Sequence, residues 1–297
     1  MLALIDGDIC AYRVGWTTEN DDFPIARWRV DEMLDGILLD TGATEFTVFL
    51  SDSAENNFRY KIYPEYKANR TTLPRPKHLE GIKEHLVLRW NARLALGQEA
   101  DDALGIAQTQ HYWAFGHPAQ SVICSIDKDL MQILGNHYNF VRKEHTFVTP
   151  EEALRYFYRQ ILTGDTADNI KGAKGIGPVK ADRILGPLKS EELGLARAVF
   201  ETYCKAFGIT SSSSVGAREE IHKYITKIGQ VLKIRQIEDE PLWHFPLESL
   251  TLESPSLSSP KTQEAVGPSS EPTTPDKNGV QLLGESMDGS SKITQEV

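Results

Sequence analysis

The chain has 297 residues, of which 40% are hydrophobic and 25% are charged, and its formal net charge is −10 at pH 7. This length allows two core-forming units, or one larger α/β domain with an appendage. Because it contains no apolar run of about 18 residues and reaches an acid too early for a signal peptide, we expect a soluble, cytoplasmic protein with no membrane partner.

Three short apolar runs, each followed at once by an acid, predict buried parallel strands separated by helices. The runs are residues 2–5, 46–50 and 122–126, the acids are Asp6, Asp52 and Asp127, and the helical segments are 24–40, 76–90 and 101–114. These features predict an α/β fold with a mostly parallel central sheet flanked by helices. Ligands bind beyond the carboxyl ends of such strands, and one acid there is easily a helix cap, but three favour a site.

Further acids occur in three clusters along the chain. An acid-rich helix start is ordinary, since negative charge favours the first turn of a helix. Asp165 and Asp168 would share one face of a helix, where like charges repel. Divalent cations reverse that cost, and carboxylate oxygens suit Mg²⁺ or Mn²⁺ better than zinc. The clusters are Glu99, Asp101 and Asp102; Asp127 and Asp129; Asp165 and Asp168.

The stretch IKGAKGIGPVKADRIL, residues 170–185, predicts a short helix, a tight Gly-Ile-Gly turn and a second helix that begins at Pro178. Gly175 and Gly177 would let the backbone approach a phosphate, and Lys174 and Lys180 add positive charge. This pattern is typical of a helix-hairpin-helix that grips a nucleic-acid backbone without reading bases. A lone GxG carries little weight, because glycine turns also end helices for structural reasons.

The three cysteines and eight histidines show no CxxC, HxH or HExxH spacing, so neither a disulfide framework nor a zinc cluster is indicated. We expect Cys10, Cys124 and Cys204 to be buried structural thiols. The helical segments beyond residue 186 have apolar spacing that indicates packing. Residues 248–297 contain eight acids, three bases and no aromatic residue, which predicts a disordered acidic tail rich in Ser, Thr and Pro.

Taken in order, the motifs IDGD, FLSD, FRYKIYPEYKANR, EADD, SIDKDL and GDTADNIKGAKGIGPVKA resemble the 5′-nuclease (flap endonuclease) family. They look closest to the 5′→3′ exonucleases of short-tailed bacteriophages. The motifs cover residues 2–185, and a weaker likeness continues to about residue 247. The resemblance implies a PIN-like nuclease core at 1–163, with a short arch region at about 57–85, and a helix-hairpin-helix and C-terminal helical lobe at 164–247.

The resemblance also implies two divalent metal ions, Mg²⁺ or Mn²⁺, and a monovalent K⁺ at the hairpin. Two metals activate water and stabilise the leaving oxygen, so no side-chain nucleophile is needed. The first metal would be held by Asp6, Asp52, Glu99 and Asp101, with Asp102 beside them, and the second by Asp127, Asp129, Asp165 and Asp168. Lys174, Gly175, Gly177 and Lys180 would contact DNA.

YKANR resembles the family motif that supplies catalytic cations. On a helix, Lys67 and Arg70 would lie on one face and meet the scissile phosphate, although by itself the motif is an ordinary basic turn. Tyr66, Tyr60 or Tyr63 would stack on a terminal base, unless they pack in the core. Asp8 stands where a relative often carries Asn and is assigned as a spare or second-shell carboxylate.

These features predict a metal-dependent 5′→3′ exonuclease that acts in phage DNA replication or recombination, on duplex 5′ ends, flaps and RNA-DNA hybrids. The short, proline-marked segment after Arg70 leaves open whether flaps are threaded. One alternative is a DNA-binding relative with weak or no catalysis. Another is a haloacid-dehalogenase-like phosphatase with Asp6 as nucleophile, which leaves EADD and the hairpin unexplained. The sequence does not fix the oligomeric state.

Overall fold

The computed structural model describes residues 1–115, 120–188, 191–210 and 214–246. All of these residues lie in the first of the two units of the chain, Met1–Leu252. The tail predicted to be disordered lies outside the described residues. No helix in the described ranges is both long enough and apolar enough to cross a membrane.

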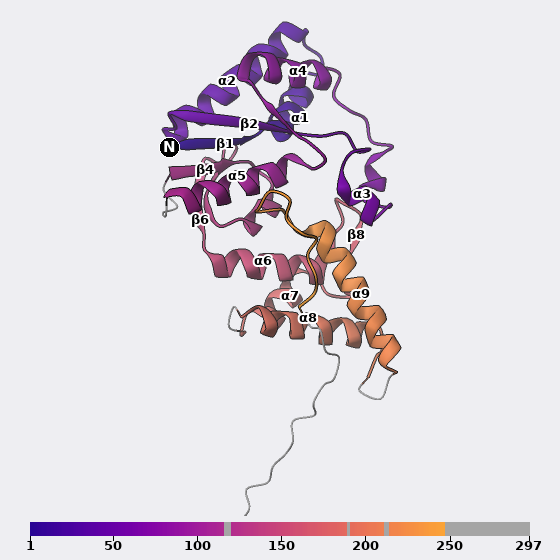
Figure 1. Cartoon of the computed structure of the whole chain (residues 1–297). Helices are drawn as coiled ribbons and strands as arrows, with labels where there is room; N and C mark the ends of the chain where they lie inside the picture. The colour runs from indigo at the N-terminus through magenta and orange to yellow at the C-terminus, as the bar shows by residue number, and fades with distance from the viewer. Residues whose placement is uncertain (116–119, 189–190, 211–213, 247–297) are drawn as a thin grey trace, which may run out of the picture. The chain divides into compact units, whose positions relative to one another are not determined.

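A six-stranded sheet runs through the first unit, with the strand order β3-β2-β1-β4-β5-β6 (Figure 1). Neighbouring strands from β3 to β5 are parallel, and β6 is antiparallel to β5. The predicted α/β fold with a mostly parallel sheet is therefore confirmed. The strands are β1 (Leu2–Asp6), β2 (Glu45–Ser51), β3 (Arg93–Ala95), β4 (Ser121–Cys124), β5 (Gly135–Asn139) and β6 (Glu144–Val148).

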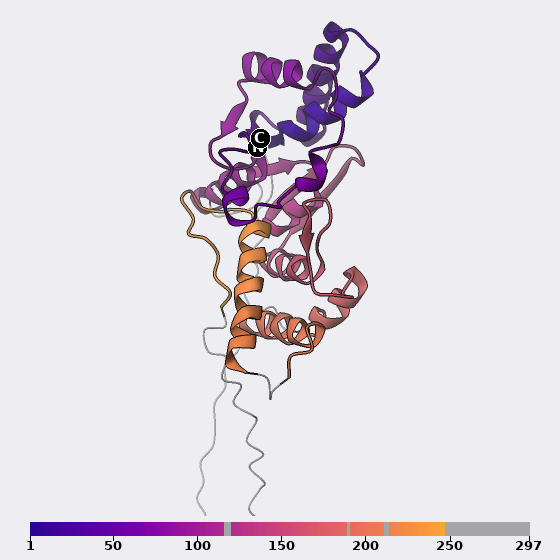
Figure 2. The same cartoon turned by 90° about the vertical axis from the view of Figure 1, so that its right-hand side faces the viewer.

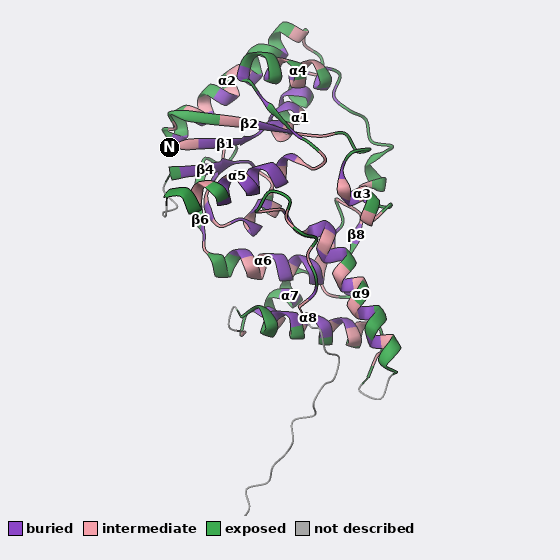
Figure 3. Ribbon diagram, in the orientation of Figure 1, coloured by how far each residue is buried: buried purple, intermediate pink, exposed green. Residues whose placement is uncertain are grey.

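Helices cover both faces of this sheet (Figure 1). Along β1, Ala3 and Ile5 point into a core shared with α1, α2 and α4, whereas Leu4 points into a second core against α5. This alternation is the period of two that a strand imposes on its side chains, and Figure 3 shows the buried segments of the helices facing the sheet. The helices are α1 (Gly7–Thr17), α2 (Phe23–Thr41), α4 (Leu79–Trp90) and α5 (Ala100–Phe115).

Helix α1 was not among the predicted helices, because its first residues continue directly from the apolar run of β1. Asp6 ends the strand and also caps the helix. A Cβ at Gly7 would lie 2.7 Å from the carbonyl oxygen of Phe49, so the close approach of α1 to β2 requires glycine here. The predicted helix at 76–90 begins later, at Leu79.

A second group of helices packs around its own apolar core, and α9 lies against both α6 and α8 (Figure 2). This confirms that the helical segments beyond residue 186 pack through their apolar faces. The chain then returns from the end of α9, and Phe245, which is 2% exposed, enters the same core. The helices are α6 (Pro150–Thr163), α7 (Pro178–Leu185), α8 (Glu192–Ala206) and α9 (Val215–Leu232).

The expectation of a short helix before the Gly-Ile-Gly turn is wrong. Strands β7 (Gly164–Asp165) and β8 (Ile170–Lys171) form an antiparallel pair there. The strands are so close at Gly164 and Gly172 that a Cβ on either residue would lie 2.3 Å from backbone atoms. Asp165 and Asp168 therefore lie on a turn between two strands, and not on one face of a helix as expected.

Two of the predicted thiols, Cys10 and Cys124, are buried, and Cys204 is partly buried. The region around YKANR contains a five-residue helix, α3 (Phe58–Ile62), and one 3₁₀ turn, η1 (Ala68–Arg70). Lys67 precedes that turn with a positive φ of 54°. The expectation that Lys67 and Arg70 share a helical face is therefore wrong.

Candidate active site

The carboxyl ends of β1 and β4 bring two predicted site residues together. One oxygen of Asp6 accepts the backbone N–H of Ile9 at 3.0 Å, and the other accepts the hydroxyl of Ser125 at 2.7 Å. The oxygen of the same hydroxyl accepts the backbone N–H of Asp127 at 3.0 Å. Ser125 therefore holds Asp6 and Asp127 on one side of the sheet edge.

Asp101, in the first turn of α5, lies within electrostatic range of both of these acids. Burial raises the pKa of Asp101 well above its usual value, and the charges of Asp6 and Asp127 raise it further. The pKa of Asp6 is raised to about 7, first by burial and then by Asp8 and Asp127, against the lowering effect of its hydrogen bonds. The three acids, contributed by β1, α5 and the loop after β4, thus form one mutually repelling group, in which Asp6 is buried and the other two are half-buried.

Asp129 and Asp165 extend this group. Asp129 lies in the 3₁₀ helix η3 (Lys128–Gln132), and its backbone N–H donates to Asp127 at 2.8 Å. Burial, the charge of Asp127 and the neighbouring Asp165 raise the pKa of Asp129 to about 8. Oδ1 of Asp129 is buried without a hydrogen-bond partner among the described residues. Asp165 accepts the backbone N–H of Ala167 at 2.7 Å, which fixes the turn after β7.

The donor chemistry of these acids fits a hard divalent cation. Carboxylate oxygens are the preferred ligands of Mg²⁺ and Mn²⁺, and a bound cation would remove the repulsion that raises the pKa values. The unpartnered oxygen of Asp129 is a free ligand atom of this kind. In the present conformation, however, no three His, Cys, Asp or Glu side chains of the described residues form a group that could hold a metal ion.

Lys67 inserts its ammonium group beside these acids. Its Nζ lies 2.5 Å from Oε1 of Glu99 and 3.9 Å from Oδ2 of Asp168. The hydroxyl of Tyr66 lies within hydrogen-bond distance of both carboxylates, at 2.9 and 3.0 Å. Burial acts to raise the pKa of Glu99, but Lys67 and Arg59 outweigh it and lower that pKa. Because Tyr66 is 2% exposed, the expectation that it stacks on a base is wrong.

The YKANR segment is docked on the turn between β7 and β8. The guanidinium of Arg70 lies 2.5 Å from Oδ1 of Asp168, and the backbone N–H of Lys67 donates to the carbonyl of Asp168 at 3.0 Å. Two asparagines then link the segments reciprocally, each donating from its side chain to a carbonyl of the other segment. The bonds run from Asn69 to Thr166 at 2.9 Å and from Asn169 to Glu65 at 2.8 Å.

Asp102 has a different environment from the other acids of EADD. It forms a bidentate ion pair with Arg59 at 2.5 and 2.8 Å, and the side chains are 0% and 3% exposed. It also accepts the backbone N–H groups of Glu99 and Arg235 at 3.1 and 3.0 Å. Burial opposes ionisation of Asp102, but Arg59 keeps its pKa below the usual value. The structure thus commits the oxygens of Asp102 to holding α3, α5 and Arg235 together.

Asp52 and Asp8 are also occupied by protein groups. Asp52 accepts the backbone N–H of Gly97 at 2.8 Å and two further hydrogen bonds, which lower its pKa. Asp8 accepts the backbone N–H of Ser51 at 2.7 Å and pairs with Lys83 of α4 at 2.5 Å. Asp8 therefore connects α1 to the end of β2 and to α4, as a supporting carboxylate would.

The Gly-Ile-Gly turn presents open backbone before α7. Gly175 has a φ of +77°, which side chains disfavour, and Gly177 is the N-cap residue of α7. A Cβ at either glycine would meet no atom within 4 Å. Nζ of Lys180 donates to the carbonyl of Gly175 at 2.8 Å, so one of the predicted cations steadies the turn.

Several residues of the site were missed by the sequence analysis. Arg59 and Lys83 each neutralise an acid that is far away in the sequence, and Asn69 and Asn169 join two segments about 100 residues apart. One local signal was available for Asn169, because asparagine tolerates the positive φ of 59° that this turn requires.

Residues 1–158 match a protein-family model described as 5′-3′ exonuclease, N-terminal resolvase-like domain. The chain is 32% identical over 219 residues to the thermostable DNA polymerase I of Thermus aquaticus, covering 67% of this chain and 24% of that protein. It is 27% identical over 195 residues to a 5′-3′ exonuclease of Buchnera aphidicola, covering 59% of this chain and 66% of that one. The chain thus spans about a quarter of the length of the Thermus polymerase and just under two thirds of the length of the Buchnera exonuclease.

The fold is similar to that of the T5 D15 protein co-crystallised with metal ions. The TM-score is 0.50 at 15% identity, over 77% of this chain and 99% of the T5 chain. At 15% identity this similarity shows a shared fold and nothing more.

Replacing Asp102 by Asn should strongly destabilise the fold. The change leaves the buried charge of Arg59 uncompensated, so we expect the free energy of unfolding to fall by about 3–5 kcal/mol, measured by urea denaturation. An exposed pair supplies the control: Glu32→Gln, next to Arg29, should change stability by less than about 1 kcal/mol. A loss for Asp102→Asn as small as that of Glu32→Gln would contradict the structural role of Asp102.

Proposed function

Because the chain belongs to the 5′-3′ exonuclease family, we propose that it is a divalent-metal-dependent nuclease that hydrolyses DNA phosphodiester bonds from 5′ ends. The observation that carries this proposal is the group of buried and half-buried, mutually repelling carboxylates at the sheet edge, with Lys67 and Arg70 beside it. A phosphate and divalent cations would balance this excess of negative charge.

The acids fall into two sets that would hold two metal ions, Mg²⁺ or Mn²⁺. When bound, the metals would activate the attacking water and stabilise the leaving oxygen. Asp6, Glu99 and Asp101 surround the first position, and Asp127, Asp129, Asp165 and Asp168 the second. Asp52, expected in the first set, and Asp102, expected beside it, use their oxygens to hold loops and helices, and we assign them supporting roles.

Lys67 and Arg70 would stabilise the charge that develops on the scissile phosphate. Both cations already face carboxylates, and both belong to a segment fixed on the turn that carries Asp168. Such preorganised donors contribute most when the reacting phosphate gains negative charge. Their attachment to this turn means that the cations and the second set of acids keep a constant relative position.

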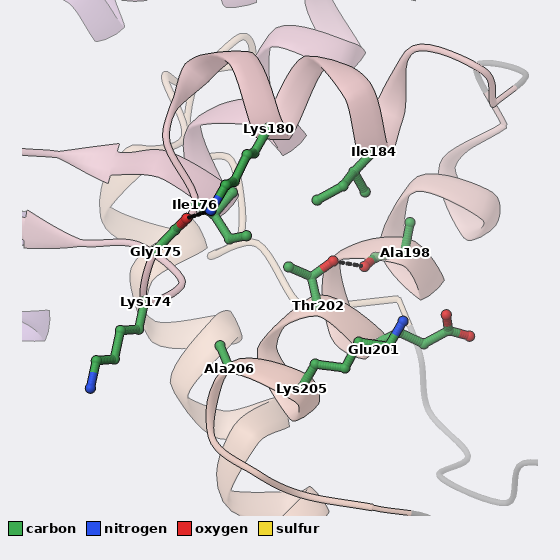
Figure 4. A pocket seen from close by; sticks show the side chains of 10 residues that line it. All are labelled: Lys174, Gly175, Ile176, Lys180, Ile184, Ala198, Glu201, Thr202, Lys205 and Ala206. Atoms are coloured by element: carbon green, nitrogen blue, oxygen red, sulfur yellow. Dashed lines mark hydrogen bonds between the residues drawn. The ribbon is translucent and has the colours of Figure 1, made fainter.

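The hairpin before α7 would hold the duplex away from the cut site. Its open glycines and the charges of Lys174 and Lys180 (Figure 4) favour a phosphate, and we propose that a K⁺ ion binds at this turn. Flap cleavage and removal of RNA from hybrids use the same hydrolysis and are included. The narrower expectation of a role in phage DNA replication is supported only by the likeness to the T5 fold.

The two alternatives differ in what they require of the acids. A phosphatase with Asp6 as nucleophile gives no role to the neighbouring acids Asp101, Asp127 and Asp129. A DNA-binding relative without catalysis has no use for a cluster of carboxylates. Their mutual repulsion destabilises the fold, so such a protein gains nothing by keeping them. Digestion of 5′-labelled duplex, flap and hybrid substrates with and without Mg²⁺ separates all three functions.

Asp127→Asn and Asp165→Asn should each reduce hydrolysis of 5′-labelled duplex in Mg²⁺ by more than about 100-fold, because each removes a ligand atom. Binding of the same duplex in EDTA should persist, since each change also reduces repulsion of the phosphates. Lys171→Gln, a change on the adjacent β8 away from the acids, is the control and should keep activity. Wild-type turnover by either acid variant would show that our metal assignment is wrong.

Arg70→Ala should lower kcat by about 100-fold on every substrate length, because its charge matters most in the transition state. Arg75→Ala is the matched control, since Arg75 is an exposed arginine of the same region that pairs with Glu80. A change confined to KM would place Arg70 in substrate binding, and its assigned catalytic role would be wrong.

Gly177→Val should raise KM for long duplexes more than for very short ones. The new Cβ meets no protein atom within 4 Å, and the φ of −99° suits valine, so folding should be unaffected. The side chain would instead obstruct a phosphate that approaches the turn. Equal losses of activity on long and short duplexes would exclude a remote gripping role for the hairpin.

A further inference from the structure

One buried hydroxyl group joins the two sets of acids proposed to hold metal ions. Ser125, which directly follows β4, donates its hydroxyl proton to Oδ2 of Asp6 at 2.7 Å. The oxygen of the same hydroxyl accepts the backbone N–H of Asp127 at 3.0 Å. Asp6 belongs to the first set and Asp127 to the second, and Ser125 has no role in the function proposed so far.

Chemistry fixes the direction of both hydrogen bonds. A backbone N–H can only donate, so the oxygen of Ser125 is the acceptor from Asp127, and its one proton is left for Asp6. Oδ1 of Asp6 accepts a further bond, from the N–H of Ile9 at 3.0 Å. A carboxylate oxygen that accepts one hydrogen bond keeps a lone pair. Asp6 is therefore held in place through both oxygens and can still bind a cation.

Asp127 passes this constraint on to Asp129. Oδ1 of Asp127 accepts the backbone N–H of Asp129 at 2.8 Å, and Asp127 is the N-cap residue of η3. A chain of hydrogen bonds thus runs from the end of β1 through Ser125 to the two acids of η3. The hydroxyl of Ser125 is the link in this chain between the first set of acids and the second.

The backbone of Ser125 is held independently of its hydroxyl. Its N–H donates to the carbonyl of Tyr138 on β5 at 3.2 Å, and the residue is 9% exposed. Because the neighbouring strand fixes the main chain, loss of the hydroxyl should leave the path of the chain unchanged. It would instead free Asp6 and Asp127 from each other, and their like charges would favour a larger separation.

We propose that Ser125 is a positioning residue that fixes the distance between the two metal sites. The proposal rests on the proposed function in one respect, namely that the acids hold two divalent cations. Hydrogen-bond partners of metal ligands orient those ligands, and their loss typically lowers metal affinity or activity by about 10–100-fold. Since Ser125 bonds to one residue of each set, removal of its hydroxyl should weaken binding at both sites.

The test measures binding of Mn²⁺ alone to the full chain, followed through the EPR signal of the free ion. The wild-type protein should bind two ions, and Ser125→Ala should lower the affinity of both sites by about tenfold or more. The Mg²⁺ concentration that gives half-maximal hydrolysis of duplex should rise by a similar factor. Duplex binding in EDTA should equal that of the wild type, because a buried hydroxyl does not meet DNA.

Ser121→Ala is the matched control. Ser121 lies at the other end of the same strand, is 4% exposed and donates its hydroxyl to Gln108 at 2.7 Å. Both alanine variants lose one buried hydroxyl, so their unfolding midpoints in EDTA should fall by similar amounts. Only Ser125→Ala should lose Mn²⁺ affinity. Ser125→Thr keeps a hydroxyl that can make both bonds and should bind Mn²⁺ nearly as well as the wild type.

The outcomes separate this proposal from the nuclease function. Equal Mn²⁺ affinities of Ser125→Ala and the wild type would show that the hydroxyl does not position the ligands, and the nuclease function would stand. A loss for Ser121→Ala as large as that for Ser125→Ala, or no recovery in Ser125→Thr, would also contradict the positioning role. A wild-type protein that binds no Mn²⁺ would reject the metal-dependent function itself, and this proposal with it.

Discussion

The bidentate ion pair between Arg59 and Asp102 lies where water does not reach, and such a pair is favourable only when its remaining polar atoms are also bonded. Here they are bonded by two carbonyl groups at the end of α9 and by the N–H of Arg235. Asp102 also accepts the N–H of Glu99 and so sets the start of α5. The position of the acids on α5 therefore depends on a segment more than 100 residues later.

Around the Arg59–Asp102 ion pair, the rest of the site combines repelling carboxylates with a few cations. Burial, with the charges of neighbouring acids, raises the pKa of Asp101 and Asp129, and Lys67 and Arg70 supply positive charge to Glu99 and Asp168. Those cations are attached through backbone and asparagine bonds to the turn that carries Asp168. The acids, the two cations and the asparagines that fix them thus lie mainly at strand ends and turns. Side chains can be placed there without disturbing a core.

The sequence predicted the features that depend on local pattern. Apolar runs followed by acids identified β1, β2 and β4, and the geometry of parallel sheets placed those acids at one edge. Helix α1 was not predicted, because Asp6 both ends a strand and caps the helix. Strands β7 and β8 were not predicted, because their pairing depends on the close approach of the backbone at two glycines. The ion pair of Asp102 with Arg59 was not predicted, because Arg59 is 43 residues away and one sequence does not reveal such pairs.

The return of the chain after α9 also determines when the bonds around Arg59 can form. Residues 1–158 contain the sheet and most of the acids, yet the carbonyl groups that complete the Arg59 shell belong to Val231 and Lys233. During translation these residues leave the ribosome only after nearly the whole described chain has been made. The hydrogen bonds around Arg59 and Asp102 can therefore be completed only late, through a long-range contact. A truncated or unfinished chain would accordingly carry the charged residues without the fold that aligns them.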